Sequence, residues 1–190
     1  MKRILLVALV AALVSGCAFN AQTIDLHPTI STPHSAEGQG VSVAVRVVDE
    51  RASQSLGHRG SAAGAAAEIT TNSDVKAIVS EQVIHALQNE GFTVLGPTAQ
   101  GNANLTVEVR LIQYSTSVGF WTGGIQIEAT LEAKAEKAGK NFEQMYRVKN
   151  EQRVVVVPTA DKNAEWINAA LGDVITKLVT DQKLLTFLAS

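Results

Sequence analysis

Four stretches of the chain alternate between apolar and polar residues, which is the period of a β-strand with one buried side. In segment 41–47 every residue of one side is valine, so we predict a half-buried strand there. Segment 104–113 alternates in the same way, and segment 125–136 has one apolar and one largely charged side. The fourth stretch, 142–157, slips out of phase near Asn150, which predicts a bulge.

Turn-forming residues mark where these strands begin and end. The run Ala138-Gly139-Lys140-Asn141 predicts a hairpin that joins the third and fourth stretches. Pro158 then ends the fourth strand. A shorter strand is predicted over 92–95, closed by Gly96-Pro97.

Two other stretches carry apolar residues at helical spacing. The first follows Thr71-Asn72-Ser73-Asp74, which offers several N-cap residues, and ends at Gly91, a residue suited to the left-handed turn after a helix. The second is predicted to start at a cap that is either Thr159 or Asp161. Its apolar positions are Trp166, Ile167, Ala170, Leu171, Val174, Leu178 and Val179. A short helical turn is predicted to follow from Asp181.

The order of these elements, β-α-β-β-β-β-α, predicts the fold class. The first crossover makes its two strands parallel, whereas the later strands form an antiparallel meander. We therefore expect a two-layer α+β domain over residues 41–190. It has a mixed, mostly antiparallel sheet of about five strands, with two amphipathic helices on one face.

The beginning of the chain has the composition of a secretory signal. Lys2 and Arg3 are followed by the uncharged apolar run 4–14 and then by small residues, which predicts a signal peptide over 1–16. The run is shorter than the roughly 20 apolar residues that a transmembrane helix needs.

The stretch Leu13-Val14-Ser15-Gly16-Cys17 resembles the lipobox of bacterial lipoproteins. That resemblance implies a covalent lipid on Cys17 after cleavage, and several acyl chains anchor a protein stably. Simple secretory cleavage after Ala18 is the alternative. Residues 17–40 contain prolines and glycines and are predicted to be the lipidated N-terminus and a tether, part of which can lie along the domain.

A further resemblance concerns the membrane to which the lipoprotein is sorted. In enteric-type lipoproteins an aspartate after the lipidated cysteine retains the protein at the inner membrane, and this chain has Ala18 there. We therefore expect an outer-membrane anchor with the domain facing the periplasm. The formal net charge is −2, and it becomes −4 without Lys2 and Arg3 of the leader, which argues against a nucleic-acid partner.

Asp49 and Arg51 follow the first strand and lie on the same side of the chain. They predict either a partner-binding ion pair or a structural pair, in which Asp49 accepts backbone amides and Arg51 holds the long loop 52–72. Within that loop Gly57-His58-Arg59-Gly60 predicts an exposed flexible turn, with contact to an anion as the alternative.

The adjacent aromatics Phe120 and Trp121 lie in a glycine-flanked segment between two strands. Exposed rings of this kind are frequent hot spots at protein interfaces, so we predict that they contact a partner; the alternative is a loop folded back on its own core. The four histidines are scattered, and Cys17 is the single cysteine. We therefore expect no metal site, no cofactor, no catalytic residues and no enzymatic activity.

Several of these features together resemble the YajG family of bacterial outer-membrane lipoproteins. They are the lipobox at Cys17, segments 23–26 and 28–30, the strand that ends in Asp49-Glu50-Arg51, the helix before Gly91, Leu105-Thr106-Val107 and the strand with Tyr146-Arg147. The resemblance implies the location and the fold, because the family has no established activity.

These observations favour a lipid-anchored envelope lipoprotein that binds an envelope protein or peptidoglycan. The alternative is a subunit of an oligomeric export or appendage assembly, in which copies of the chain associate.

Overall fold

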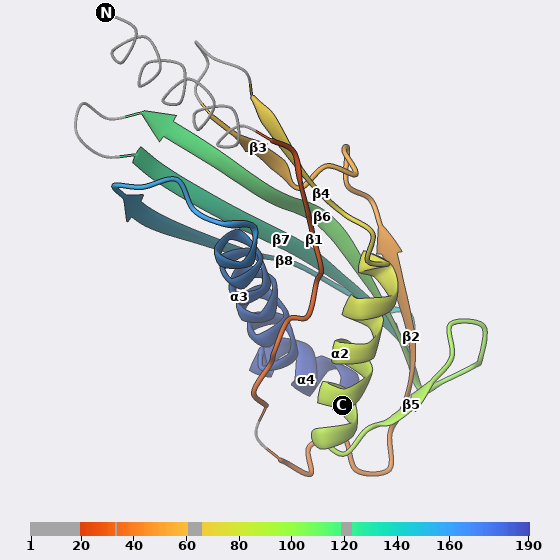
Figure 1. Ribbon diagram of the computed structural model, residues 1–190. Coiled ribbons are helices and arrows are strands. Elements are labelled where there is room, and N and C mark those ends of the chain that lie inside the picture. The colour runs from red at the N-terminus through yellow and green to blue at the C-terminus, as the bar shows by residue number, and fades with distance from the viewer. Residues whose placement is uncertain (1–19, 33, 61–65, 119–122) are drawn as a thin grey trace, which may run out of the picture.

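The computed structural model describes residues 20–32, 34–60, 66–118 and 123–190. In these ranges it has one curved sheet with three helices on one face (Figure 1). The strands are β1 (Gln22–Ile24), β2 (Ser42–Asp49), β3 (Gly57–Arg59), β4 (Ala67–Thr71), β5 (Thr93–Leu95), β6 (Ala103–Val118), β7 (Gly123–Lys137) and β8 (Lys140–Val154). The helices are α2 (Val75–Asn89), α3 (Ala160–Val179) and α4 (Gln182–Ala189).

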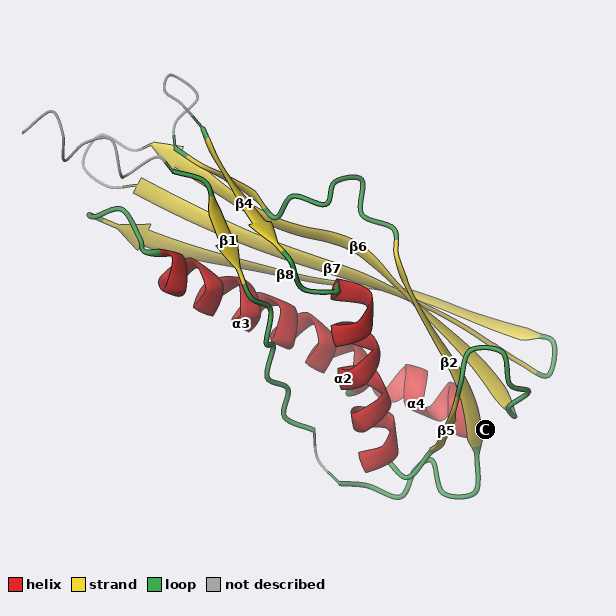
Figure 2. Ribbon diagram, turned by 45° about the vertical axis from the view of Figure 1, so that its right-hand side comes forward, coloured by secondary structure: helices red, strands yellow, loops and turns green. Residues whose placement is uncertain are grey.

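The three longest strands, β6, β7 and β8, form an antiparallel ribbon that runs the length of the molecule (Figure 2). Lys137 pairs with Lys140, and both turn residues between them, Ala138 and Gly139, have positive φ. Positive φ at both positions defines the two-residue turn whose twist matches a β-hairpin. The predicted hairpin is therefore confirmed.

The bulge predicted near Asn150 is wrong. Asn150 pairs in unbroken register with Ile127, and β8 ends at Val154 rather than at residue 157. The irregularity lies instead in β6, between Val109 and Leu111. Burial alternates through Val154, because Asn150 and Gln152 take half-buried positions on the same side of the strand as Tyr146 and Val148.

One edge of β6 is shared by two strands. Because β7 pairs with β6 along its whole length, β2 and β3 must both use the opposite edge. The strand β2 is parallel to the first half of β6 as far as the pair Asp49 and Val109, and β3 rejoins β6 at the pair Gly57 and Tyr114. The sheet therefore forks where β6 bulges, and β3 continues through β4 to β1.

The helices begin at residues that were among the candidate caps, and the structure selects one for each helix. Asp74 accepts a hydrogen bond from the backbone N–H of Ala77, and of the two candidate caps of α3 it is Thr159 that accepts from Lys162. Asp181 caps α4, the short helical segment that the sequence indicated after it.

The core lies between the helices and one face of the sheet. Helix α2 packs on β2 and β5, whereas α3 packs on β7 and β8 and α4 on the end of β7. The pairing of β2 with β5 is parallel, as predicted. The largest fully buried side chains are Tyr114, Leu26, Leu56, Ile69, Leu87, Leu105, Ile127, Leu131, Ile167, Leu171, Ile175 and Leu178.

The mixed α/β architecture with helices on one face is thus present, but the details differ from the prediction. The described residues contain eight strands rather than about five, and three helices rather than two. The additional strands, β1, β3 and β4, are three to five residues long, and of these the sequence indicates only β4, as a short strand near residues 68–70. The predicted exposed turn at 57–60 is wrong, because residues 57–59 form β3 and Arg59 is buried.

Candidate functional site

The segment after the predicted lipidation site is part of the domain. Residues 22–24 form β1, which pairs in parallel with β4. The side-chain amide of Asn163, in the first turn of α3, donates a 2.8 Å hydrogen bond to Oε1 of Gln22. Leu26 is fully buried. Within the segment predicted as a tether, part of which can lie along the domain, residues 22–26 therefore pack as part of the folded domain.

A second amide holds the same segment one helical turn further along α3. Nδ2 of Asn168 donates to the carbonyl oxygen of Asp25 at 3.1 Å, and Oδ1 of Asn168 accepts from the backbone N–H of His27 at 2.7 Å. Gly172 continues this line, because a Cβ there would lie 2.5 Å from the carbonyl oxygen of Thr29. The first ordered segment and α3 are thus fitted to each other over about three helical turns.

Three consecutive valines beside this segment are exposed to solvent. Val155, Val156 and Val157 connect β8 to α3, and they are 83%, 74% and 56% exposed. Together with Met145 they are the large apolar side chains that stand out as exposed among the described residues. We call residues 155–157 the valine patch. An exposed apolar cluster of this kind is typical of an interaction surface.

A hollow of about 290 Å³ adjoins the valine patch. It lies where the sheet ends, and its lining comes from the ends of β3, β6, β7 and β8 and the connection to α3. The lining residues are Arg59, Gly60, Tyr114, Thr116, Ser117, Gly123, Gly124, Ile125, Val154, Val155, Val156, Val157 and Pro158. Burial raises the pKa of Tyr114 to about 12, so its phenol is neutral at physiological pH. Apart from Arg59, the hollow is uncharged.

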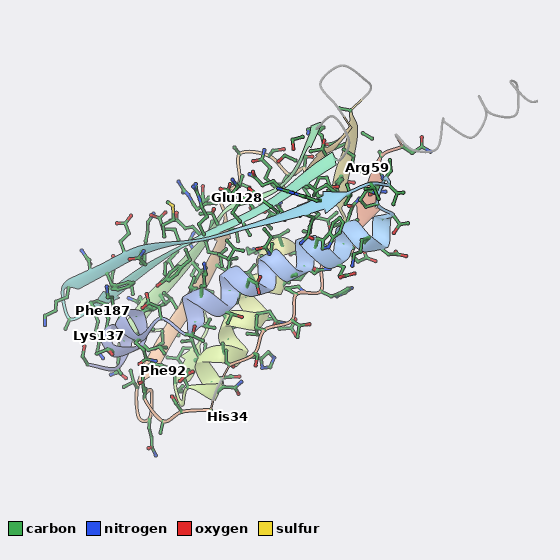
Figure 3. All side chains as sticks on the ribbon, turned by 90° about the vertical axis from the view of Figure 1, so that its left-hand side faces the viewer. His34, Arg59, Phe92, Glu128, Lys137 and Phe187 are labelled. Carbon is green, nitrogen blue, oxygen red and sulfur yellow. The ribbon has the colours of Figure 1, made fainter. Side chains whose placement is uncertain are left out.

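The valine patch was not predicted, because the apolar residues of 142–157 resemble those of one continuous strand. The signal was present, since a run of four valines before Pro158 does not alternate. Figure 3 shows Arg59 at this end of the sheet and Lys137 and Phe187 at the opposite end. Phe120 and Trp121 lie outside the described residues, between Val118 and Gly123, which pair with each other. Cys17 also lies outside them.

Asp49 and Arg51 meet where the sheet forks. Nε and one terminal nitrogen of Arg51 each donate to Asp49 at 2.8 Å, and the same terminal nitrogen donates to Gln54 at 3.2 Å. Asp49 also accepts the backbone N–H of Arg51 at 3.3 Å. The hydrogen bond from Arg51 holds the pKa of Asp49 below its ordinary value. Only 3% of the Arg51 side chain is exposed, so its contacts are those of a structural pair; a role in partner binding stays a prediction.

The face of the sheet away from the helices carries ion pairs, some within one strand and some between neighbouring strands. Lys134 lies 2.9 Å from Glu108 and 3.5 Å from Glu132, and Arg110 lies 3.0 Å from Glu108. Further along the ribbon Arg147 lies 3.1 Å from Glu128, which points away from the helices in Figure 3. We call this the helix-free face. Its charges are largely paired, so it is polar without a strong field of either sign.

The described part of the chain contains no group of three or more histidine, cysteine, aspartate or glutamate residues placed to hold a metal ion. None of its helices combines the length and apolar character needed to cross a bilayer.

Comparison with known proteins identifies relatives over nearly the whole chain. The sequence model of the Lipoprotein_16 family, described as "Uncharacterized lipoprotein", matches residues 28–189. The chain is 25% identical over 194 residues to "Uncharacterized lipoprotein YajG" of Escherichia coli strain K12, and the alignment covers 98% of this chain and 96% of that protein.

Two solved structures share the fold. Protein XCC0632 from Xanthomonas campestris, of family DUF330, has a TM-score of 0.54 at 15% identity, covering 88% of this chain and 95% of that one. A putative neuraminyllactose-binding hemagglutinin homolog from Helicobacter pylori also has a TM-score of 0.54, at 10% identity, covering 88% and 96%. At such identities the likeness concerns the fold alone.

Proposed function

Because this chain belongs to the uncharacterized lipoprotein family whose sequence model it matches, we propose that it is a lipid-anchored envelope lipoprotein. The lipid is on Cys17, the anchor is in the outer membrane, and the domain faces the periplasm. There it acts as a non-enzymatic module that binds another envelope protein or peptidoglycan.

The observation that carries the binding role is the helix-free face. The strands β6, β7 and β8 have 15 or 16 residues each, so the face is roughly 50 Å long. No described helix covers it (Figure 2). Its paired charges and the half-exposed Met145 offer a broad, polar surface with an apolar point, which suits contact with a large partner rather than with a small substrate.

Phe120 and Trp121 are proposed as further partner contacts on the basis of their sequence context. We propose that Asp49 and Arg51 contribute to partner binding by holding the loop that follows them, because the guanidinium of Arg51 is itself buried.

One observation favours the alternative of an assembly between copies. Strand β8 pairs only with β7 among the described strands, so a fifteen-residue edge is open to a second chain. Its outward side chains include Arg147, Lys149 and Glu151, charges of the kind that natural proteins use to discourage edge-to-edge pairing. We therefore rank the assembly second.

The anchor is tested by changing the residues that would carry it. Cys17→Ala should leave a protein without the lipid. Its mass shows whether the leader has been removed, and protein of the mature size should no longer fractionate with membranes. Ala18→Asp should keep the lipid and move the protein from the outer to the inner membrane fraction. A Cys17→Ala protein of mature size that still fractionates with membranes would refute the lipid anchor.

The binding role is tested by photo-crosslinking in intact cells. Photo-reactive residues at Met145, Arg147 and Trp121 should give adducts with one dominant envelope protein or with peptidoglycan. The same groups at Glu81 and Ala169, which are exposed on the helices, are the matched controls. Adducts only between copies of the chain would favour the assembly, and equal labelling at all five positions would argue against a specific partner.

A further inference from the structure

The attachment of the first ordered residues fixes where a lipid on Cys17 can lie relative to the domain. Gln22 is already held by β4 and by Asn163. The five residue steps from Cys17 to Gln22 span at most about 18 Å when fully extended. If the chain is anchored as proposed above, its domain is therefore held close to the bilayer instead of hanging from a long tether.

The end of the domain that is held close is the end with the valine patch. Asn163 lies in the first turn of α3, and residues 155–157 lead directly into that helix. The bond between Asn163 and Gln22 thus brings the anchored segment to the same end as the valines. Figure 1 shows β1, the end of β8 and the start of α3 at this end, whereas the β7–β8 turn and α4 lie at the other.

The chemistry of this end fits a lipid surface. Three valines in sequence are more than half exposed, and the hollow behind them is lined mostly by apolar side chains. Apolar surface of this kind gains free energy when it leaves water for the boundary between headgroups and acyl chains. A single acylated residue nearby would hold the patch at that boundary at high effective concentration.

The geometry points to a membrane-contact surface: the valine patch, Val155–Val157, rests in the surface of the bilayer that holds the lipid of Cys17. The long ribbon then projects away from the membrane, and the helix-free face remains accessible from the periplasm. This inference rests on the proposed lipid anchor and adds to it an orientation.

The chain offers a clean way to test the orientation. Cys17 is its only cysteine, so once Cys17 is acylated an introduced cysteine is the only free thiol. We would label Val156→Cys with an environment-sensitive fluorophore in the full-length protein produced with its leader in cells. The protein would be reconstituted in phosphatidylethanolamine–phosphatidylglycerol vesicles that contain a lipid with a quencher just below the headgroup.

Two labelled variants serve as matched controls. Lys140→Cys lies at the opposite end of β8, roughly 48 Å from Val154. Met145→Cys replaces another exposed apolar side chain, on the helix-free face. We expect the label at position 156 to shift to shorter emission wavelength and to lose at least about half of its intensity to the quencher, and the controls to change little.

Flotation of the vesicles separates the two proposals. Protein that does not float with the vesicles refutes the lipid anchor itself. Protein that floats while the labels at 156 and 140 respond alike refutes only the membrane contact. A photo-crosslinker at Val156 in intact cells that yields a protein adduct instead of lipid adducts would also overturn the inference, and would assign the patch to a protein partner.

Discussion

The side-chain amide of Asn163 donates a 2.8 Å hydrogen bond to the side-chain oxygen of Gln22, 141 residues earlier in the chain. Asn163 is fully buried whereas Gln22 is half-buried, so loss of Gln22 would leave the Asn163 amide without a partner in the core. This contact joins the first strand of the domain to the first turn of α3, and it fixes the direction from which the N-terminal segment arrives.

We therefore expect Asn163→Ala to loosen the N-terminal segment. The substitution should lower the free energy of unfolding by about 2 kcal/mol, measured by urea denaturation, because it removes a buried hydrogen bond and leaves a small cavity. Hydrogen exchange should become faster over residues 22–24 and stay unchanged at the β7–β8 turn. Unchanged exchange over 22–24 would show that the pairing of β1 with β4 is sufficient to hold the segment.

Gly172→Ala tests the close fit between α3 and the same segment. Alanine at an ordinary helix position stabilises by about 1 kcal/mol relative to glycine. Here its Cβ would lie 2.5 Å from the carbonyl oxygen of Thr29, so either the helix or the segment must move. We expect a net loss of about 1–2 kcal/mol in thermal or urea unfolding, with faster hydrogen exchange over residues 26–30.

Ala169→Gly is the control for that experiment. Ala169 is exposed on the same helix, so glycine there should cost about 1 kcal/mol through helix propensity alone. Exchange over residues 26–30 should then remain as in the parent protein. A stabilising effect of Gly172→Ala would contradict the close fit.

Asp49→Asn should change how stability depends on pH. The pKa of Asp49 is lowered in the folded protein, first by its hydrogen bond with Arg51. Its contribution is therefore complete above the unfolded-state pKa of about 4 and is lost as the pH falls through the folded-state pKa. At pH 7 we expect the variant to be less stable by about 2 kcal/mol, because the buried guanidinium loses its carboxylate.

The measurement is urea unfolding between pH 2 and pH 7. The difference in free energy of unfolding between the variant and the parent should narrow as the pH falls below about 4. There the parent loses the stabilisation by the Asp49 carboxylate, which the variant lacks at every pH. Asp25→Asn, at an exposed side chain, is the control. A gap of constant size at every pH would show that the carboxylate charge is not what matters.

Tyr146→Phe should weaken the attachment of α4. The hydroxyl of Tyr146 donates a 2.7 Å hydrogen bond to Oδ2 of Asp181, whose other oxygen caps α4. Burial, followed by the bond to Asp181, raises the pKa of Tyr146, so the phenol remains a donor at neutral and mildly alkaline pH. We expect a loss of about 1 kcal/mol and faster exchange in residues 182–189, with Thr186→Ala as a control on the exposed side. Unchanged exchange would show that apolar packing alone holds α4.

The elements with a long periodic pattern could be predicted from the sequence. The strands β6 and β7 and the helices α2 and α3 each repeat their pattern of apolar and polar residues over ten or more residues. The sequence also offered candidate N-caps for the two helices. The short strands β1 and β3 could not, because three residues do not define a period. Their place in the sheet depends on contacts with residues far along the chain, such as Tyr114 and Asn163.

The candidate sites differ in the same way. Cys17 could be predicted as a lipidation site because the prediction depends only on the residues directly before it. The valine patch could not, because four valines in a row also fit a buried strand, and only the end of the pairing with β7 at Val154 leaves residues 155–157 in solvent.

The distance in sequence between Gln22 and Asn163 also bears on when the domain can fold. Contacts between residues far apart in the sequence form late in folding, because the loop between them must close before the contact can stabilise the chain. If the chain is exported as proposed, Gln22 crosses the inner membrane long before Asn163, and the contact between them can form only when α3 has crossed. The domain then closes late in translocation, which keeps the earlier part of the chain open enough to be exported.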